Sequence, residues 1–368
     1  MQNREHCRRT GFAGLLLALL LGLSGQHSPA QRTDANTPTQ RIEEECVALS
    51  WAPDSVRLAF AVRRVVRQQR LEMQRDDIWL LSLAEGKRRR IVNGEKIVST
   101  RIPFSYTVRG LRWSPDGHRL TAELDTRQMV DERGNTREEW MTLLLDENGR
   151  EIKIQGGDSV IPQALGAAWL GDGVTVGYLT EVVSPRLLFS LHTVRPVAGR
   201  GRQLFSQSTF AAVAWIARQN LAVAIERDVE LRERPRLVRL DLERQTRQVL
   251  AELEGFFGHL TVSPSGEKVA YFRDADTLEI RRLDGPMETT RLRMAYGRYQ
   301  WAPDESRLLL HRAVENRSGS LHWVRLPGGE VEPVLHGLSF RDAELSPDGR
   351  WLAVLQPGSQ HLLVYALQ

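Results

Sequence analysis

Short apolar runs recur along the chain, and each is followed by a tight polar turn and a second apolar run. Five strings carry the full turn, at residues 51–54, 113–117, 262–266, 301–304 and 345–349. Two weaker copies lie at residues 169–173 and at Trp215. We call the first residue of each copy the anchor, so the anchors stand at positions 51, 113, 169, 215, 262, 301 and 345. A repeat of this length that contains several short strands indicates a β-propeller.

Each repeat has room for four strands. In the fifth repeat, apolar runs cover residues 259–262, 268–272, 278–283 and 289–294. Pro presets φ, Asp bonds its own backbone and Gly accepts a positive φ, so the Pro-Asp-Gly string is a hairpin turn. The anchor Trp offers a large apolar surface that suits packing between neighbouring blades. The sequence therefore predicts an all-β fold, a seven-bladed β-propeller with four-stranded antiparallel blades.

The last repeat supplies only three strands, at residues 341–345, 351–355 and 361–366. An open ring would leave an unpaired strand edge. Residues 39–44 precede the first anchor and belong to no blade. We therefore expect an N-terminal strand to close the last blade.

The first thirty residues have the features of a secretory signal peptide. Arg4, Arg8 and Arg9 precede an apolar run over residues 12–23, and Ser28-Pro29-Ala30 fits a cleavage site. The run is shorter than a membrane span needs, so we expect no permanent span, with an uncleaved anchor as the alternative. The expected organisation is a signal peptide (1–30), a short linker (31–38) and the propeller (39–368), which places the protein in the periplasm or outside the cell.

Charge and cysteine content exclude several classes of function. The 50 basic residues nearly balance the 46 acidic ones, and removal of residues 1–30 lowers the net charge from +4 to +2. We therefore expect no nucleic-acid partner. Cys7 leaves with the signal peptide, so Cys46 has no cysteine with which to form an internal disulfide. Its apolar neighbours favour a packing role for its side chain.

The string Trp113-Ser114-Pro115-Asp116-Gly117, followed by an apolar strand, resembles the WD-repeat-like repeat of the TolB-type propeller family. Residues 77–80 and 321–324 are similar to the third strand of that repeat, and Asp284-Gly285 and Gly328-Gly329 to the turn after it. The resemblance covers residues 39–368 and implies the propeller fold. TolB itself has a separate α/β domain before its propeller, so a role in the Tol-Pal system is not implied. Oligopeptidase relatives carry a Gly-x-Ser-x-Gly string, which this sequence lacks.

The channel mouth is one candidate site, because the first strand of each blade lines a propeller's channel. The residues that open these strands are polar or basic, and we expect them to point inward: Arg109, Gln163, His259, Arg298 and Arg341. Arginines at this mouth suit an acidic sugar or another carboxylate. An error of one residue in strand register would exchange inward and sideways positions.

A partner-binding rim on blades one and two is the second candidate. The loops after Val62 and Glu123 and the link at residues 93–108 are longer than their equivalents in later blades, and long loops on a rigid scaffold often bind partners. The rim candidates are basic or aromatic: Arg63, Arg64, Arg67, Arg70, Phe104 and Tyr106. They suggest an envelope protein or an anionic glycan as the partner. The alternative is that these loops are elongated hairpins with a solvated charged face.

Motifs for chemistry are largely missing from the sequence. It contains no zinc-protease, P-loop, dinucleotide or calcium-loop pattern, so we expect no metal and no cofactor. The sequence favours an exported, monomeric, non-catalytic binding or scaffold module of the bacterial cell envelope. One alternative is a propeller lyase or hydrolase that acts on acidic glycans, with His259 and Arg298 as its candidate residues. A second alternative is a structural part of an envelope complex without a small ligand.

Overall fold

The structure is a computed structural model in which the chain divides into two units, Met1–Asp34 and Ala35–Gln368. It describes residues 37–68, 71–96, 105–129, 136–154, 157–183, 188–196, 201–228, 233–284, 289–294, 297–312, 320–335 and 340–367. All of these residues belong to the second unit. Among them, no helix is long and apolar enough to cross a membrane.

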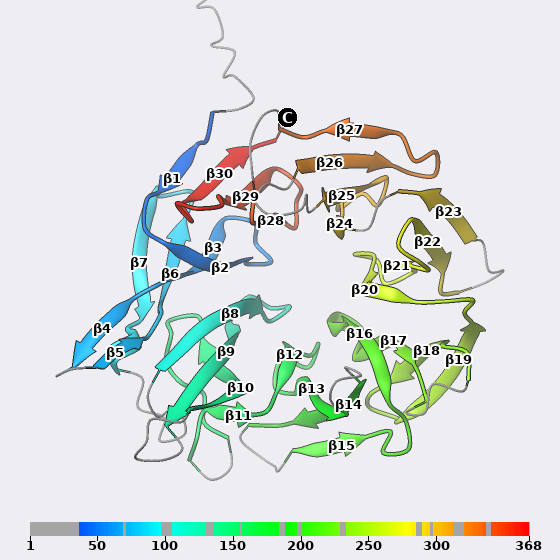
Figure 1. The fold of residues 1–368 in the computed structure, drawn as a ribbon, viewed down its shortest axis with the longest axis horizontal. Coiled ribbons are helices and arrows are strands. Elements are labelled where there is room, and N and C mark those ends of the chain that lie inside the picture. The colour runs from blue at the N-terminus through cyan, green and yellow to red at the C-terminus, as the bar shows by residue number, and fades with distance from the viewer. Residues whose placement is uncertain are drawn as a thin grey trace, which may run out of the picture. The chain divides into compact units, whose positions relative to one another are not determined.

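The described strands form four-stranded antiparallel sets around a central opening (Figure 1). We number the sets as blades in chain order and give their strands from the centre outwards. Blade 1 consists of β2 (Cys46–Trp51), β3 (Arg57–Val62), β6 (Asp77–Ser82) and β7 (Lys87–Val92). Blade 2 consists of β8 (Ser105–Trp113), β9 (Arg119–Met129), β10 (Thr136–Asp146) and β11 (Val160–Pro162). Blade 3 consists of β12 (Leu165–Trp169), β13 (Val176–Val183), β14 (Leu188–Val194) and β15 (Arg202–Leu204).

The later blades follow the same order. Blade 4 consists of β16 (Phe210–Ile216), β17 (Leu221–Glu226), β18 (Arg236–Asp241) and β19 (Thr246–Glu252), and one pair, Phe189 with Phe210, joins it to blade 3. Blade 5 consists of β20 (Phe257–Val262), β21 (Lys268–Phe272), β22 (Thr277–Arg282) and β23 (Thr289–Arg293). Blade 6 consists of β24 (Arg298–Trp301), β25 (Arg307–Arg312), β26 (Ser320–Arg325) and β27 (Val331–Pro333). Blade 7 consists of β28 (Asp342–Leu345), β29 (Trp351–Leu355), β30 (Leu362–Ala366) and β1 (Gln40–Ile42).

The N-terminal strand closes the last blade. β1 pairs antiparallel with β30, with Gln40 opposite Val364, and the Thr39 backbone N–H donates to the Val364 carbonyl at 2.7 Å. Ile42 is 4% exposed and packs into the core between blades 7 and 1. The predicted all-β propeller class and its closing strand are therefore confirmed.

Three of the five anchor tryptophans tie their inner strand to the blade before it, whereas Nε1 of Trp169 and of Trp301 has no hydrogen-bond partner among the described residues. The indole Nε1 of Trp113 donates to the Ser50 carbonyl at 3.1 Å, and that of Trp51 to the Glu344 carbonyl at 3.0 Å. The Trp215 indole does the same to the Gly166 carbonyl at 2.8 Å, so a weak repeat copy keeps the contact. These bonds satisfy the polar edge of the three rings, and they confirm the expected packing between blades.

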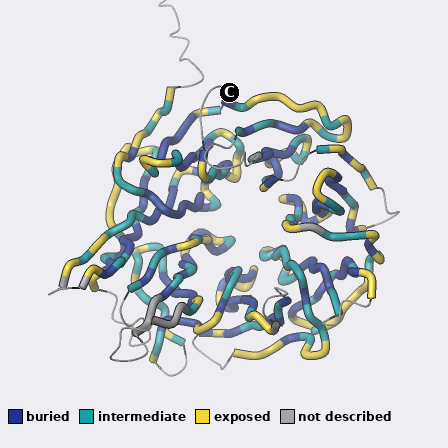
Figure 2. The backbone as a smooth tube through the Cα atoms, in the orientation of Figure 1, coloured by how far each residue is buried: buried dark blue, intermediate teal, exposed yellow. Residues whose placement is uncertain are grey.

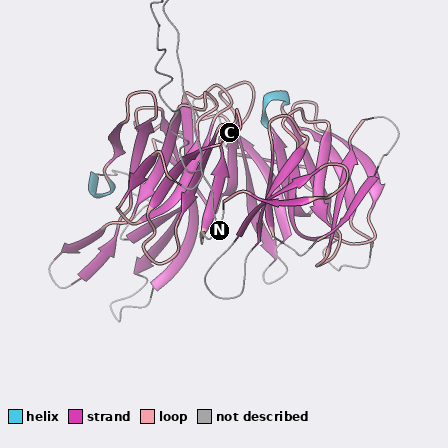
Figure 3. Cartoon of the chain, turned by 90° about the horizontal axis from the view of Figure 1, so that it is seen from above, coloured by secondary structure: helices cyan, strands magenta, loops and turns pink. Residues whose placement is uncertain are grey.

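The two ends of the blades differ. The turns from first to second strand and from third to fourth strand share one end, which we call the turn face, and the other connections share the loop face (Figure 3). Gly117 has a φ of +73° in its turn, a conformation that favours glycine. Middle strands such as β3, β21 and β29 are mostly buried, inner strands such as β16 and β28 are largely half-buried, and the outer strands β7, β19 and β27 are largely exposed (Figure 2).

The long loops of blades 1 and 2 are largely hairpins. The loop after Val62 contains the two-stranded ribbon of β4 (Val65–Gln68) and β5 (Leu71–Gln74), and the loop after Glu123 is an extension of paired strands β9 and β10. Short 3₁₀ turns, η1 (Gly94–Lys96) and η2 (Ala217–Gln219), are the helical elements of the described residues. The elongated-hairpin alternative therefore describes these two loops.

Candidate functional site

The central channel contains a cavity of about 600 Å³, which we call the channel cavity. Inner strands of blades 2 to 7 line it. Its apolar wall includes the anchor tryptophans Trp113, Trp169 and Trp215. Its ionisable side chains come from four blades: Arg112, His259, Arg298, His311, Asp342 and Glu344.

Adjacent inner strands position the basic and acidic groups of this cavity. Arg298 on β24 lies opposite His311 on β25, and its Nη1 is 3.5 Å from Asp342 Oδ1 on β28. The His259 ring meets the edge of the Tyr299 ring with centroids 5.4 Å apart. The Tyr299 hydroxyl donates to the His259 carbonyl at 2.9 Å, so this tyrosine fixes the strand that carries the histidine.

Burial sets the protonation of the acidic group nearest blade 1. Burial raises the pKa of Glu344 to about 8, the Asp342 charge adds to the rise, and the Arg112 charge opposes it. The Trp51 backbone N–H donates to Glu344 Oε1 at 3.2 Å and also opposes the rise. At neutral pH the Glu344 carboxyl is therefore mostly protonated.

The two histidines of the cavity are neutral at neutral pH. Burial lowers the pKa of His259, and the charges of Arg298 and Arg112 lower it further. Burial also lowers the pKa of His311, although Asp342 opposes this shift. The channel cavity therefore holds two arginines, Arg112 and Arg298, and one carboxylate in an ion pair, that of Asp342, so basic groups outnumber acidic charges in it.

Two of the five predicted channel residues line this cavity, His259 and Arg298. The structure does not bring the other three to it. Arg109 forms an ion pair with Asp125 at 2.6 Å in blade 2. Gln163 is exposed in a left-handed conformation with φ of +56° after β11. Arg341 is exposed and its Nη1 donates to Gln360 Oε1 at 2.8 Å.

Strand register explains both the misplaced residues and those that the prediction missed. Nine of the lining residues stand one or three positions before an anchor: Arg112, Ala168, Ala214, His259, Thr261, Arg298, Gln300, Asp342 and Glu344. Arg109 and Arg341 stand four positions before their anchors, and one residue of slip moves a side chain to the other face of a strand. Counting back from the anchor would have found Arg112, Asp342 and Glu344. His311 lies on a second strand, where the repeat gives no such signal.

The predicted rim is less basic than its sequence suggests. Arg63 pairs with Glu45 at 2.6 Å. Arg64 pairs with the buried Asp77 at 3.0 Å, and Arg67 pairs with Glu72 at 2.8 Å. Each of these guanidinium groups is thus matched by a carboxylate of the same blade. Two further rim candidates, Arg70 and Phe104, lie outside the described residues.

Tyr106 is an internal residue, not the surface contact that the sequence suggested. It is 2% exposed, and its hydroxyl donates to the Asp76 carbonyl at 2.9 Å. The Asp76 side chain accepts from the Val108 backbone N–H at 2.8 Å, and burial raises the pKa of Asp76 to about 6. Tyr106 therefore fastens blade 2 to blade 1 because its apolar ring is buried and its hydroxyl finds a carbonyl.

The described part of the chain offers no group of three or more His, Cys, Asp or Glu side chains that could hold a metal ion. Cys46 is fully buried, and burial raises the pKa of its thiol to about 12. Within these residues, the channel cavity is a place where ionisable groups from four blades converge.

Comparison with known proteins identifies the fold. No protein-family model matches the chain, and no curated protein matches it. Among solved structures, the Cps50 (Swd1) β-propeller domain of Myceliophteria thermophila is similar with a TM-score of 0.62 and 13% identity, over 90% of this chain and 100% of that chain.

Two further propellers are similar at the same level. The Dos1 propeller matches with a TM-score of 0.52 and 11% identity, over 90% of this chain and 95% of that chain. The C-terminal WD40 domain of Sif2 matches with a TM-score of 0.54 and 14% identity, over 90% of this chain and 84% of that chain. The chain therefore has the fold of these β-propeller domains, including the WD40 domain of Sif2, and the likenesses describe its fold alone.

Proposed function

We propose that the protein is an exported, TolB-type binding module of the bacterial cell envelope that holds an anionic ligand in its channel without catalysis. The proposal rests on the channel cavity, where Arg112 and Arg298 converge from different blades while Glu344 is mostly protonated. Guanidinium groups bind carboxylates by paired hydrogen bonds, which favours an acidic sugar or another carboxylate. The N-terminal signal pattern supports export.

Binding of acidic oligosaccharides tests the site. We expect oligouronates to bind the propeller in calorimetry, and Arg112→Ala and Arg298→Ala each to weaken binding at least tenfold with an unchanged melting temperature. Arg67→Ser is the matched control, because it removes an exposed arginine of the rim without touching the channel cavity. Equal affinities of the wild type and both channel variants would exclude the channel as the site.

A pull-down from envelope extract tests the rim in the same way. Loss of a captured protein on replacement of Arg63, Arg64 and Arg67 by Ser, with the channel variants unaffected, would replace the channel proposal by the scaffold alternative. Fractionation of cells that express the full chain tests export, since we expect the shortened mature protein outside the cytoplasm.

An enzyme is the second candidate, because the channel cavity holds groups that exchange protons near neutral pH. His259 is neutral and accepts a proton, and Glu344, whose pKa is about 8, can donate one. A lyase would remove the proton beside the uronate carboxylate with His259 as the base and break the C–O bond to the next sugar, whose departing oxygen takes the proton of Glu344. The carbon–carbon double bond that forms leaves an unsaturated sugar. Ultraviolet absorbance of such a product from oligouronates, lost in His259→Ala, would establish this activity in place of binding alone.

A further inference from the structure

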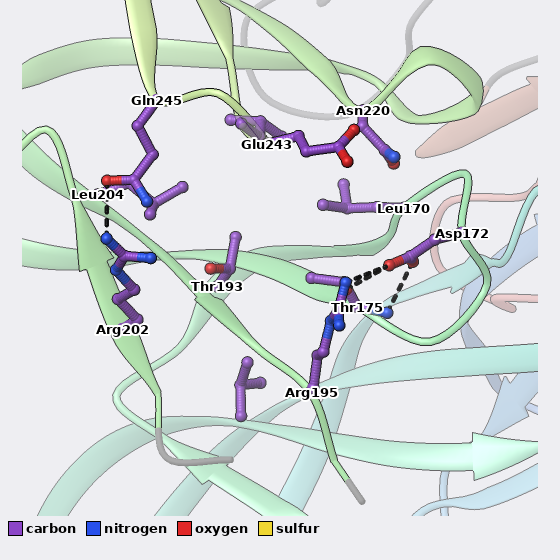
Figure 4. Close-up of a pocket in the computed structure, with 12 residues that line it drawn as sticks. Leu170, Asp172, Thr175, Thr193, Arg195, Arg202, Leu204, Asn220, Glu243 and Gln245 are labelled. Atoms are coloured by element: carbon purple, nitrogen blue, oxygen red, sulfur yellow. Dashed lines mark hydrogen bonds and ion pairs between the residues drawn. The ribbon is translucent and has the colours of Figure 1, made fainter. Parts of the chain in front are cut away.

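A second pocket lies on the turn face between blades 3 and 4, and we call it the 3–4 cleft (Figure 4). Its volume is about 360 Å³. Buried aliphatic side chains form its floor: Leu170, Val194, Leu204 and Leu242. An apolar floor with a few polar groups around it is the usual composition of a small-ligand site.

Two other clefts on the turn face, between blades 1 and 2 and between blades 2 and 3, are filled by an arginine six residues after the anchor. Between blades 1 and 2, the guanidinium group of Arg57 lies 5.1 Å from the centre of the Trp113 ring and donates to Glu147 Oε2 at 3.0 Å. Between blades 2 and 3, Arg119 lies 5.2 Å from the Trp169 ring centre and donates to the Gly173 carbonyl. The repeat therefore closes these clefts with its own side chain.

Thr175 replaces this arginine in blade 3. It is six residues after the anchor Trp169, and its hydroxyl donates to Asp172 Oδ2 at 2.5 Å. A threonine is too short to cross to the next blade, so the space that Arg57 or Arg119 fills elsewhere stays open.

The acidic partner is replaced as well. The Glu147 backbone N–H donates to the His118 carbonyl at 2.9 Å, and the Leu242 backbone N–H donates to the Asn220 carbonyl at 3.1 Å. His118 and Asn220 each stand five residues after the anchor of their blade, so Glu147 and Leu242 occupy equivalent positions. Leu242 thus stands where Glu147 receives Arg57, so both members of the ion pair are lost at the 3–4 cleft. Between blades 5 and 6, where Lys268 and Glu305 pair at 3.1 Å, the corresponding pocket is only about 210 Å³.

The walls of the 3–4 cleft carry opposite charges. Arg195 and Arg202 lie on the blade 3 side, and Glu243 lies on the blade 4 side (Figure 4). Arg195 is 65% exposed, 3.5 Å from Asp172, and Arg202 donates to Gln245 Oε1 at 3.0 Å. Among the described residues, the Glu243 carboxylate has no ion-pair or hydrogen-bond partner.

We propose that the 3–4 cleft binds an aliphatic α-amino-acid residue with a free carboxylate, either as the free amino acid or as the C-terminal residue of a peptide. Arg202 receives the carboxylate, and the aliphatic side chain covers the apolar floor. Arg195 lies at the other end of the cleft, where its Nε donates to Thr175 Oγ1 at 3.1 Å (Figure 4). Glu243 accepts from the α-ammonium group or from the amide N–H. This site is on the turn face and is independent of the proposed channel function.

Calorimetry with four probes tests the cleft and separates the two sources: leucine, N-acetyl-leucine, leucinamide and a tetrapeptide that ends in leucine. We expect leucine or the tetrapeptide to bind and leucinamide to bind at least tenfold more weakly. Binding of leucine alone identifies the free amino acid, whereas equal binding of N-acetyl-leucine and the tetrapeptide identifies a peptide C-terminus. No binding by any probe, or equal binding of leucinamide, would overturn the proposal.

Two variants locate the site. Thr175→Arg restores the residue of the repeat, so we expect it to fill the cleft and abolish binding while the protein stays folded. Arg202→Gln should weaken binding at least tenfold even if Thr175→Arg does not fold. Arg282→Gln, which changes an arginine of the corresponding pocket between blades 5 and 6, is the matched control. Binding that survives both changes in the 3–4 cleft would refute its assignment.

Discussion

Replacement of Glu344 by Gln should change how the stability of the propeller depends on pH. The folded pKa of Glu344 is about 8 and its ordinary value is 4.5. The contribution of Glu344 to the free energy of unfolding is therefore fully present below pH 4.5 and is lost as the pH rises to about 8, because ionisation is easier in the unfolded chain. The difference between these two pKa values corresponds to about 5 kcal/mol in the free energy of unfolding. Since the side chain lines a water-accessible cavity, we expect about 2 kcal/mol.

Urea unfolding between pH 5 and pH 9 measures this effect. Gln does not titrate and its amide oxygen can still accept from the Trp51 backbone N–H. The two proteins should be similarly stable at pH 5, and the variant should be more stable by about 2 kcal/mol at pH 9. Other titrating groups, such as Asp76 and His259, contribute equally to both proteins. Parallel stability curves over this range would show that the Glu344 carboxyl is solvated and that its burial has been misjudged.

Three further changes probe the fold. Deletion of residues 37–44 removes the closing strand, and the lost burial and backbone bonds should lower the melting temperature by about 10 °C; an unchanged value would contradict closure by β1. Gly117→Ala places a Cβ at a φ of +73° and 3.1 Å from Arg57 Nη2, so calorimetric unfolding should show a loss of about 2 kcal/mol, unlike the control Gly110→Ala. The Cys46 thiol, with a pKa of about 12, should react with a thiol reagent only after unfolding, and labelling of the native protein would refute its burial.

The repeat made most of the fold predictable. Turns built on Pro, Asp and Gly fix the first hairpin of a blade, and the anchor Trp fixes its packing, so even the weak copy at Trp215 lies where its spacing predicts. Counting strands in the last blade was enough to place the closing strand, because a propeller with an open edge is unstable. These features follow from local sequence and from one topological requirement.

The candidate site was predictable only in part. His259 and Arg298 were found, but Arg341 was chosen in place of Asp342, one residue along the same stretch of chain. Strand ends shift by a residue without changing the apolar pattern, and each shift reverses which side chains face the channel. The anchor is a better reference than the strand end, because it directly precedes the hairpin turn that the sequence identifies.

Charge clusters misled the prediction for a different reason. Sequence shows which residues are basic but not which carboxylates the fold brings to them, as with Arg64 and the buried Asp77. The 3–4 cleft was missed for the same reason, because Thr175 becomes informative only when Arg57 and Arg119 are seen to fill the corresponding clefts.

Departures from the repeat are the strongest indication of function in this protein. Equivalent positions in different blades have closely similar structural surroundings. The fold alone therefore gives no reason for one blade to have a different type of residue at such a position. One position before the anchor, blades 3 and 4 have Ala168 and Ala214, whereas blade 7 has Glu344. Its raised pKa means that the contribution of this carboxyl to the free energy of unfolding is lost as the pH rises from 4.5 to about 8, which an alanine would avoid. A residue that lowers stability, at a position where other blades have a residue without this cost, is expected at a functional site. This favours the channel cavity over the rim, whose charges are paired.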